Sequence, residues 1–534
     1  MASTTSIILL ISFVFTSSAT AITTNCPDHH NHNSSHCKCT YIKTHQNCHT
    51  KGYINYLQIY YCTLSTHPQL GFLLLLIWLA ILFYLLTNTA SYYFCPTVEN
   101  LSKILNLSPA IAGTTLLPLG NGSPDVFASI ISFTASGDGG DIGLNSIVGG
   151  AIFVSTVVVG ILSLLITYRR KYVKVDKLNF IRDVVFLLFA LSNLLVIIII
   201  GEINFWASIA FASTYIVYIG LVSYMHIISI KKDGNINETY RQNGQYYDIR
   251  LPLLVQSAEK VAPNKKKVIM LILFVVGLPI NLPRRLTIPM VTQEQWSKPI
   301  GVISVVLAPI MLALIFNTQQ GKMGLECSMV IYGAALVIGV TLGTCTFAFT
   351  SSTMAPQKCL FLWYASGFLM SVMWTYITAE ELVSLLQSIG VIIGLNSSIL
   401  GLTVLAWGNS LGDLTANVAL AMHDGPDGAH IAIAGCYAGP VFNIFVGLGF
   451  SFVIACWLDY PAPFIVLENP YLCETVGFLI CGLLWALVVL PSRDMQLDRT
   501  LGLGLLVIYL CFIFIKIARV VGLIDDSSST SLVK

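Results

Sequence analysis

The sequence predicts an all-α polytopic membrane protein, an inverted-repeat helical bundle with about twelve transmembrane helices after a signal peptide. Three observations predict this class. The 534 residues include only 28 Lys and Arg and 26 Asp and Glu, about 10% of the chain, whereas a soluble domain carries about 25%. Hydrophobic residue types make up 55% of the chain, and apolar runs of about 20 residues recur from position 70 onward. Finally, one polar motif occurs twice, each time inside a long apolar run.

Residues 1–21 are typical of a secretory signal peptide. A short polar start precedes the apolar core Ile7–Phe15, and Ala19-Thr20-Ala21 matches the small-residue pattern of a cleavage site. The alternative is an uncleaved anchor, although an apolar core of about nine residues is too short to cross a bilayer. We therefore expect residues 22–69 to lie outside the cytosol.

The predicted lumenal or extracellular segment 22–69 is rich in histidine and cysteine. Disulfides form in that compartment, and Asn33-Ser34-Ser35 is a glycosylation sequon, so we expect an N-glycan at Asn33. A histidine cluster offers ligands for a transition metal, but the absence of C-x-x-C spacing favours a flexible solvated segment instead. Its members are His29, His30, His32 and His36. The disulfide connectivity is open among Cys26, Cys37, Cys39, Cys48 and Cys62, with Cys473 as a candidate sixth partner.

Beyond residue 69, apolar runs alternate with polar loops. The prediction comprises a first membrane half at 70–228, a cytosolic loop at 229–298, two extra transmembrane helices at 299–349, a second membrane half at 360–521 and a polar tail at 522–534. The individual spans are expected near 70–88, 101–135, 144–167, 180–200, 203–228, 299–316, 326–349, 360–385, 393–422, 430–457, 471–490 and 500–521.

The distribution of Lys and Arg predicts the orientation of these spans. Arg169-Arg170-Lys171 follows the third span and Lys231-Lys232 ends the fifth, so both ends are cytosolic if the N-terminus is outside. The apolar run 268–282 is too short to span and has positive charge on both sides, at Lys265-Lys266-Lys267 and Arg284-Arg285. It is therefore expected to be an interfacial or re-entrant piece on the cytosolic face.

An internal repeat marks the expected functional core. Leu107–Asp125 and Leu395–Asp413 superpose at a shift of 288 residues, so that G-N-G-S-P-D falls on G-N-S-L-G-D. The match resumes one residue later, where Gly150 corresponds to Gly439. The two repeats therefore cover 101–167 and 393–457, and they enter the membrane from opposite sides. Inverted repeats of this kind are typical of secondary transporters, whose substrate sites lie at the midplane between the repeats.

The repeated motif places acidic side chains inside the membrane. A carboxylate at the centre of a transmembrane helix costs about 2.5–3.5 kcal/mol, so Asp125 and Asp413 should each have a partner. Asn121 and Asn409 lie four residues earlier, on the same helical face. Prolines and glycines break these helices and free backbone carbonyls, and six to eight oxygens that include two carboxylates suit a hard cation such as Ca²⁺. For Ser410 and Asn443, ligation and interhelical hydrogen bonding are both open.

The paired motifs, with the later G-P-V-F-N, resemble the alpha repeats of the calcium/cation antiporter superfamily. The resemblance is strongest to its cation/calcium exchanger branch, which is known in plants and related to the mitochondrial sodium/calcium exchanger of animals. It implies a sodium/calcium-exchanger-like core of ten helices with two extra central spans, and alternating access that exchanges Ca²⁺ or monovalent cations for Na⁺, K⁺ or H⁺. It also implies central ligands at Asp125 and Asp413, flanking ligands at Asn121, Asn409, Ser410 and Asn443, and backbone carbonyl ligands at Pro118 and Ala406.

The sequence departs from the broader superfamily pattern. Asp stands where other branches carry Glu, Gly150 and Val154 stand where polar ligands often occur, and Asn443 stands where an acid can occur. Fewer charged ligands disfavour a three-sodium stoichiometry and leave monovalent-cation or H⁺ coupling open.

Other functions are weaker interpretations of the same residues. An intramembrane aspartyl protease also needs two facing Asp residues, but its G-x-G-D motif is only half present, at Gly412-Asp413. A cation channel needs no inverted repeat. We therefore expect no enzymatic activity and no resident cofactor, with inorganic cations and the lipid bilayer as the partners. The net charge of +2 and the lack of long basic tracts argue against a nucleic-acid partner.

Two features outside the repeats complete the prediction. Glu380 and Glu381 are expected at the outer end of their span, as cation-attracting groups or, preferably, as interfacial carboxylates without that role. The signal peptide predicts a membrane of the secretory route, with the plasma membrane, the vacuole and the endoplasmic reticulum all open.

Overall fold

The computed structural model describes most of the membrane-spanning part of the chain. The described residues are 35–44, 52–94, 96–97, 100, 104, 109–135, 140–168, 174–233, 281–291, 296–319, 325–352, 354–356, 359–395, 397–422, 428–466 and 470–520. The predicted signal peptide, Asn33, Cys26 and Cys48 lie outside these residues, as does most of the apolar run 268–282.

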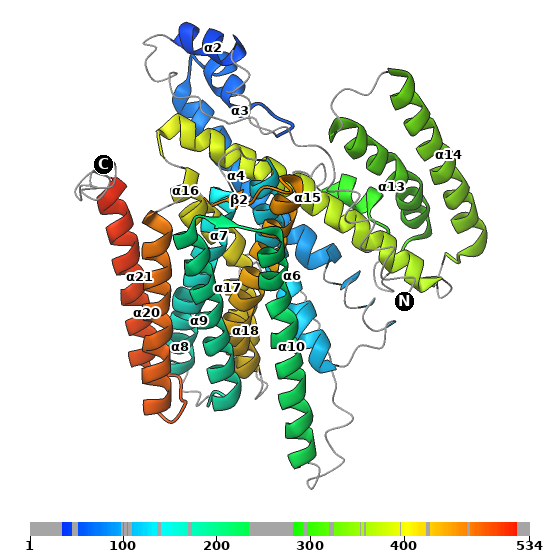
Figure 1. Ribbon diagram of the computed structural model, residues 1–534. Helices are drawn as coiled ribbons and strands as arrows, with labels where there is room; N and C mark the ends of the chain where they lie inside the picture. The colour runs from blue at the N-terminus through cyan, green and yellow to red at the C-terminus, as the bar shows by residue number, and fades with distance from the viewer. Residues whose placement is uncertain are drawn as a thin grey trace, which may run out of the picture. The chain divides into compact units, whose positions relative to one another are not determined.

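Helices dominate the described residues (Figure 1). The helices are α2 (Ser35–Thr44), α3 (Tyr56–Gln58), η3 (Ile59–Thr63), α4 (Pro68–Thr89), η4 (Ala90–Phe94), α6 (Pro109–Ala135), α7 (Asp141–Ile152), η5 (Phe153–Val158), α8 (Val159–Tyr168), α9 (Lys177–Ile200), α10 (Phe205–Asp233), α13 (Lys298–Gln319), α14 (Leu325–Phe349), α15 (Leu360–Ile393), α16 (Ser397–Leu400), η8 (Gly401–Leu405), α17 (Ala406–Met422), α18 (Gly428–Phe442), η9 (Asn443–Leu448), α19 (Gly449–Leu458), α20 (Pro470–Ser492) and α21 (Arg499–Val520). The strands are β1 (Glu202–Ile203) and β2 (Phe464–Ile465).

Ten helical segments within the described residues are long and apolar enough to cross a membrane. They match ten of the twelve predicted spans. The other two predicted spans, 101–135 and 393–422, contain α6 and α16–η8–α17 and carry the repeated polar motif. The polytopic all-α class is thus confirmed, whereas the number twelve stays a prediction.

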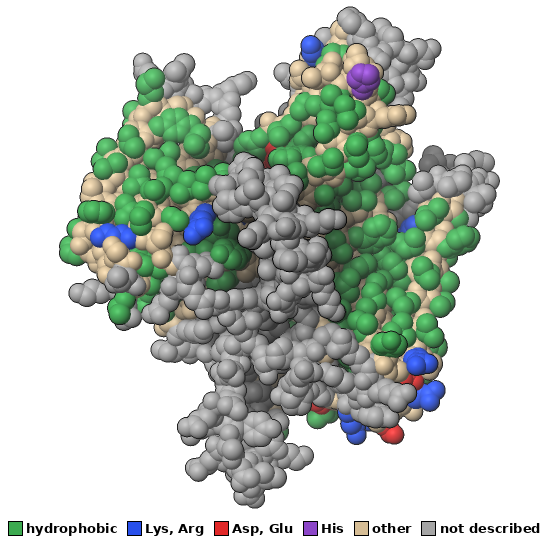
Figure 2. Space-filling view, turned by 180° about the vertical axis from the view of Figure 1, so that it is seen from behind, with side chains coloured by type: hydrophobic (Ala, Val, Ile, Leu, Met, Phe, Trp, Pro, Cys, Tyr) green, Lys and Arg blue, Asp and Glu red, His purple; other side chains and the backbone are tan. Residues whose placement is uncertain are grey.

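The side chains on the outside of the helices are suited to lipid. Val330 and Val337 on α14 and Leu510 and Phe514 on α21 are all more than half exposed. Figure 2 shows hydrophobic side chains over most of the described surface on the face that it displays, with charged side chains at only a few places. A surface of this composition is solvated by acyl chains rather than by water.

The chain divides into two compact units. The first unit contains residues 81–124 and 219–379, and it includes the antiparallel pair α13 and α14, which lie side by side (Figure 1). Gly339 of α14 lies against the backbone carbonyl of Val306, which allows the two helix backbones to approach closely. This pair corresponds to the two extra helices predicted at 299–349.

Arg284 corrects one expectation within the first unit. The sequence places it on a charged cytosolic flank, but its side chain is fully buried. Its guanidinium donates to Oγ1 of Thr89 at 2.8 Å and to the carbonyl of Leu85 at 3.1 Å, and it also bonds to Asn281. Leu85 and Thr89 lie nearly 200 residues away on α4, so the sequence pattern offered no sign of these two partners.

The second unit contains residues 21–80, 125–218 and 380–534, and two short pairings fix the directions of its helices. At one end, β1 pairs with β2 in antiparallel register, with Glu202 opposite Ile465. A second bridge joins Lys174 to Gln496. Helix α9 lies between Lys174 and β1 in the chain, and α20 lies between β2 and Gln496. The two helices are therefore antiparallel, and the two pairings mark opposite ends of the unit.

The same pairings establish the relative direction of the two broken helices. The segment α7–η5–α8 ends just before Lys174, at one end of the unit, and α18–η9–α19 ends just before β2, at the other. The segments therefore run in opposite directions, as the inverted repeat requires. Each contains a π-helical stretch, which begins at Phe153 in the first and at Asn443 in the second. Such π-bulges often occur at functional sites because they disturb the regular backbone hydrogen bonds.

Glycines bring the first repeat into close contact with η8. A side chain at Gly149 would collide with the carbonyl oxygen of Leu402, and one at Gly401 would lie 2.6 Å from the carbonyl oxygen of Ile142. Small residues at a helix crossing let the backbones approach, and this close packing holds α7 beside the helices that carry the second motif.

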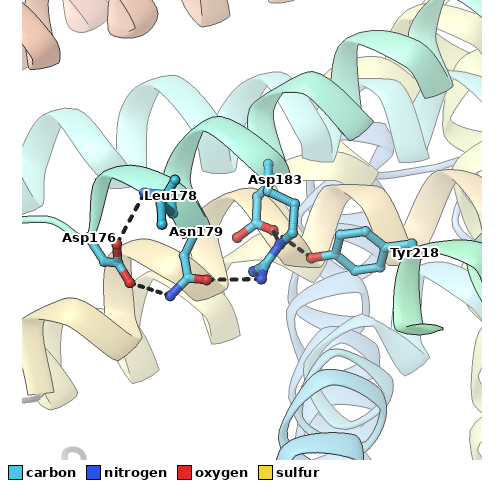
Figure 3. A network of polar contacts seen from close by, with 6 residues as sticks. Asp176, Leu178, Asn179, Asp183 and Tyr218 are labelled. Carbon is cyan, nitrogen blue, oxygen red and sulfur yellow. Dashed lines mark hydrogen bonds and ion pairs between the residues drawn. The ribbon is translucent and has the colours of Figure 1, made fainter. Parts of the chain in front are cut away.

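A buried polar network joins α9 to α10 in the same unit (Figure 3). The carboxylate of Asp183 accepts hydrogen bonds from Arg182 and from the hydroxyl of Tyr218, both at 2.8 Å. Aromatic contacts of Phe180 with Tyr437 and of Tyr215 with Phe442 then tie both helices to α18. Asp183 therefore satisfies its buried charge locally.

The segment before α4 is anchored to the second half of α15. A disulfide joins Cys39 to Cys62, which supports the expectation of an oxidising compartment. The carboxylate of Glu381 accepts hydrogen bonds from the backbone N–H groups of Tyr53 and Ile54 and from the hydroxyl of Tyr56. Glu381 is thus a buried anchor for this segment, which corrects its prediction as a cation-attracting or interfacial carboxylate.

Candidate cation site

The site is built around Asp125, in the part of α6 that belongs to the second unit. The carboxylate is 2% exposed, although α6 has no basic side chain with which it could pair. It follows Pro124, a proline inside the helix, which removes one backbone hydrogen bond just before the acid. A buried carboxylate in such a helix needs hydrogen-bond donors from neighbouring helices.

Two asparagines supply those donors, one to each carboxylate oxygen. Nδ2 of Asn409, on α17, donates to Oδ1 of Asp125 at 2.8 Å. Nδ2 of Asn443, the first residue of η9, donates to Oδ2 at 3.0 Å. The structure therefore brings three of the predicted ligand residues together from three different helical segments.

The same asparagines leave their own oxygens available. Because the carboxylate of Asp125 can only accept, both amide nitrogens must face it, and each Oδ1 must point elsewhere. Neither Oδ1 has a hydrogen-bond donor among the described residues, and both are buried. Oγ of Ser410, which is also buried, is in the same situation. Buried polar atoms without a protein partner are rare, and each one offers a position at which an ion or an ordered water could bind.

A space at Gly150 in the first repeat lies beside the hydroxyl of Ser410 and the carboxylate of Asp125. A Cβ atom at Gly150 would lie 3.4 Å from Oγ of Ser410 and 3.7 Å from Oδ2 of Asp125, in ordinary contact with both. Because glycine has no Cβ atom, a space of about one methyl group remains at Gly150, next to the Ser410 hydroxyl and the Asp125 carboxylate. The sequence identified Gly150 only as a position without a ligand, whereas the structure gives it a role in shaping the site.

Asp413 is the second acid of the repeat, on α17. Asp413 is only partly buried. It interacts electrostatically with Asp125 and with the buried Cys436 of α18. The two acids thus differ, because Asp125 is fully buried and hydrogen-bonded on both oxygens, whereas the residue Asp413 is only partly buried.

The remaining predicted ligands are less completely described. Asn121 lies four residues before Asp125 on α6, but its side chain is not among the described ones. Pro118 is buried within α6. Ala406 is buried where η8 ends, and its N–H bonds to the carbonyls of Gly401 and Thr403 rather than to that of Leu402. The carbonyls of Pro118 and Ala406 stay predicted ligands.

The donor set of the site is hard. The hydroxyl of Ser410 and the carboxylate of Asp125 border the space at Gly150, and Asn409 and Asn443 bond to the same carboxylate. Ca²⁺, Na⁺ and K⁺ prefer oxygen ligands of these kinds. Among the described residues, no group of three or more His, Cys, Asp or Glu side chains gathers that could hold a softer metal. The chemistry favoured by this arrangement is therefore the reversible binding of a hard cation.

Known proteins resemble this chain over most of its length. A family model described as sodium/calcium exchanger protein matches residues 75–224 and 363–518. The chain is 46% identical to cation/calcium exchanger 1 of Arabidopsis thaliana over 506 residues, covering 91% of this chain and 88% of that protein. It is 29% identical to the mitochondrial sodium/calcium exchanger protein of Rattus norvegicus, with coverage of 91% and 88%. Among solved structures, an H⁺/Ca²⁺ exchanger matches with 12% identity, 86% coverage of each chain and a TM-score of 0.46.

Proposed function

The chain belongs to the sodium/calcium exchanger protein family, and we propose that the oxygen cluster around Asp125 is the site at which it binds and exchanges cations. Cation/calcium antiport is the activity that this membership supports, and the protein is a multi-pass membrane transporter. The alternatives of an intramembrane aspartyl protease and of a cation channel are not supported.

The proposed ligands are the two acids and their polar neighbours. Asp125 would be the central carboxylate and Asp413 the second. The oxygens of Asn409, Ser410 and Asn443 would complete the coordination from α17 and η9, and Asn121 and the carbonyls of Pro118 and Ala406 would be further ligands. One observation carries this proposal, namely that three buried oxygens without donors accompany a buried carboxylate.

The amides of Asn409 and Asn443 suggest how the site could accommodate both the presence and the absence of a bound cation. Both amides donate to Asp125 and stabilise its charge. With a cation on the carboxylate, rotation of either amide by about 180° would exchange its nitrogen for its oxygen and add a neutral ligand. The same side chains would then stabilise the empty and the loaded site.

Charge balance explains why such a site would exchange ions. One divalent cation, two monovalent cations or two protons each neutralise two carboxylates. A doubly negative empty site would be costly to move through a low-dielectric barrier, whereas a neutralised one would not. Return of the empty carrier would therefore be slow, and uptake of Ca²⁺ would be coupled to release of Na⁺, K⁺ or H⁺.

The test is counter-ion-dependent Ca²⁺ uptake by the full chain in liposomes. Uptake of ⁴⁵Ca²⁺ should require an outward gradient of Na⁺, K⁺ or H⁺, each supplied in turn. Asp125→Asn and Asp413→Asn should each reduce uptake at least about tenfold, equivalent to about 1.4 kcal/mol. Asp183→Asn is the matched control, because Asp183 is a buried acid outside the site. Normal uptake by Asp125→Asn would refute the site, and uptake without any counter-ion would refute antiport.

The membrane in which the protein works belongs to the same proposal. We infer a membrane of the secretory route, from the predicted signal peptide and from the Cys39–Cys62 disulfide. Immunolocalisation of the tagged chain against markers of the plasma membrane, vacuole, endoplasmic reticulum and mitochondria tests this inference.

A further inference from the structure

Two rows of aromatic rings lead from α9, α10, α20 and α21 to the two broken helices of the second unit. We call each row an aromatic ladder. The first ladder consists of Phe186 on α9, Tyr218 and Tyr215 on α10, and Phe442 at the end of α18. The second ladder consists of Phe478 on α20, Phe512 and Tyr509 on α21, and Phe153 at the start of η5. The centroids of neighbouring rings are 5.1 to 5.9 Å apart, a separation at which aromatic rings attract each other.

The two ladders follow the symmetry of the internal repeat. Phe153 and Phe442 occupy the same position in the two repeats. Tyr509 and Tyr215, which contact them, lie on α21 and α10, the last spans of the two membrane halves. Both of these contacts are T-shaped, with interplanar angles of 78° and 74°. Each half of the protein therefore holds the start of the π-helix that belongs to the other half.

The contact between Tyr215 and Phe442 is part of a close helix crossing. Further along the same two segments, the ring of Phe211 on α10 lies 5.2 Å from the ring of Phe445 on η9. A Cβ atom at Gly449 would collide with α10. Tyr215 and Phe442 are both buried, so neither ring can move without opening this packing. The tyrosine ring thus fixes the backbone at the point where η9 begins.

The two ladders differ in the residue that follows the last ring. Phe442 is followed by Asn443, whose Nδ2 donates to Asp125 at 3.0 Å. Phe153 is followed by Val154, which has no polar side chain. A π-helical stretch departs from the regular pattern of backbone hydrogen bonds, so its position depends on the side chains packed against it. A shift of the backbone at Phe442 would therefore misdirect the amide of Asn443, since hydrogen bonds weaken steeply when they are misaligned.

We propose that Tyr215 is a positioning residue for cation binding, because its ring holds Phe442 and thereby aims the amide of Asn443 at Asp125. The inference rests on the proposed function, in which Asn443 and Asp125 are ligands. Tyr215 itself touches no ion and acts only through Asn443. Tyr509 is its structural counterpart, and it holds a π-helix that begins without a ligand.

The test is a double-mutant cycle between Tyr215 and Asn443, measured by ⁴⁵Ca²⁺ uptake of the full chain in liposomes. Tyr215→Leu should raise the half-saturating Ca²⁺ concentration about fivefold, the size of effect expected for one lost aromatic contact. In the Asn443→Ala background, the same substitution should change this concentration less than about 1.5-fold, because the amide that Tyr215 positions is absent. Tyr215→Phe keeps the ring and should stay within about twofold of the unmodified protein.

Tyr509→Leu is the matched control, because it removes the equivalent T-shaped contact from the other ladder. Any change that it causes in the Ca²⁺ dependence should be the same with Asn443 and with Asn443→Ala. A fivefold effect of Tyr215→Leu in both backgrounds would show that the ring supports only the fold, and it would overturn the proposal. Equal coupling of both leucine variants to Asn443, or an unchanged Ca²⁺ dependence in Tyr215→Leu, would also overturn it.

Phe442→Leu keeps the proposal testable if Tyr215→Leu does not fold. It removes the other ring of the same pair, so its effect on the Ca²⁺ dependence should also disappear in the Asn443→Ala background, and a persistent effect would refute the positioning role. The proposed function has a separate test. If Asn443→Ala alone left the Ca²⁺ dependence unchanged, the positioning role would fall with that ligand, whereas loss of uptake in Asp125→Asn would still support the site.

Discussion

The amide of Asn443 donates a hydrogen bond to Oδ2 of Asp125 at 3.0 Å, although the two residues are 318 positions apart in the sequence. One belongs to the π-helix η9 of the second repeat and the other to α6 of the first. Asn443 thereby stabilises the carboxylate without adding charge, and its own Oδ1 has no hydrogen-bond donor among the described residues. The charge of the site consequently depends on whether this position is an amide or an acid.

Conversion of this amide to an acid should change the ion preference of the site. In Asn443→Asp, a donor about 3 Å from Asp125 becomes a second negative charge, and the attraction for a divalent cation increases. We expect the half-saturating Ca²⁺ concentration of ⁴⁵Ca²⁺ uptake to fall about tenfold at alkaline pH, with slower turnover because release becomes harder. Asn417→Asp, elsewhere on α17, controls for the addition of charge. An unchanged Ca²⁺ dependence would place Asn443 outside the ligand set.

Filling the space at Gly150 should block the site without unfolding the protein. The added methyl of Gly150→Ala would lie 3.4 Å from Ser410 and 3.7 Å from Asp125, so it clashes with nothing but occupies the space proposed for the ion. We expect uptake to fall at least about tenfold while the melting temperature stays within about 2 °C. Gly477→Ala is the control, because a Cβ there meets nothing within 4 Å. Full transport by Gly150→Ala would show that the cation lies elsewhere.

The adjacent glycine should behave in the opposite way. A methyl at Gly149 would collide with the carbonyl oxygen of Leu402, and neither backbone can yield easily at a close helix crossing. Gly149→Ala should therefore lower the free energy of unfolding by about 1–3 kcal/mol. Thermal unfolding in detergent, compared with Gly150→Ala, measures this difference. Equal melting temperatures for the two variants would contradict the crossing that the structure describes.

The anchoring of the N-terminal segment should depend on Glu381. Burial and the hydrogen bond to Glu381 raise the pKa of Tyr56, so its phenol stays protonated and continues to donate. Glu381→Leu removes an acceptor shared by Tyr53, Ile54 and Tyr56, at a cost of about 1–3 kcal/mol for each donor left buried. We expect faster proteolysis of this segment and a lower melting temperature, whereas Glu381→Gln, which keeps an acceptor oxygen, should lose less. Equal proteolysis of all three proteins would refute the anchor.

Much of this site could be predicted because its signals are local. The cost of a carboxylate in lipid singles out Asp125 and Asp413 wherever they fold, and the spacing of four residues places Asn409 on the face of Asp413. Asn443 was recognisable through its place in the repeat. For Gly150 the sequence indicated only that no side-chain ligand stands there, because which atoms border the space at a glycine depends on the helices packed around it.

The sequence by itself determined the membrane class, the repeated motif and the identity of the acids, since apolar length and charge cost act within a single helix. Only the tertiary structure decided which partner each polar group meets. It buried Arg284 against α4, joined Glu381 to Tyr56, chose Cys62 as the partner of Cys39 and packed Tyr215 against Phe442. Such contacts join residues far apart in the chain or depend on helices packed around one side chain, and no periodicity or composition encodes them.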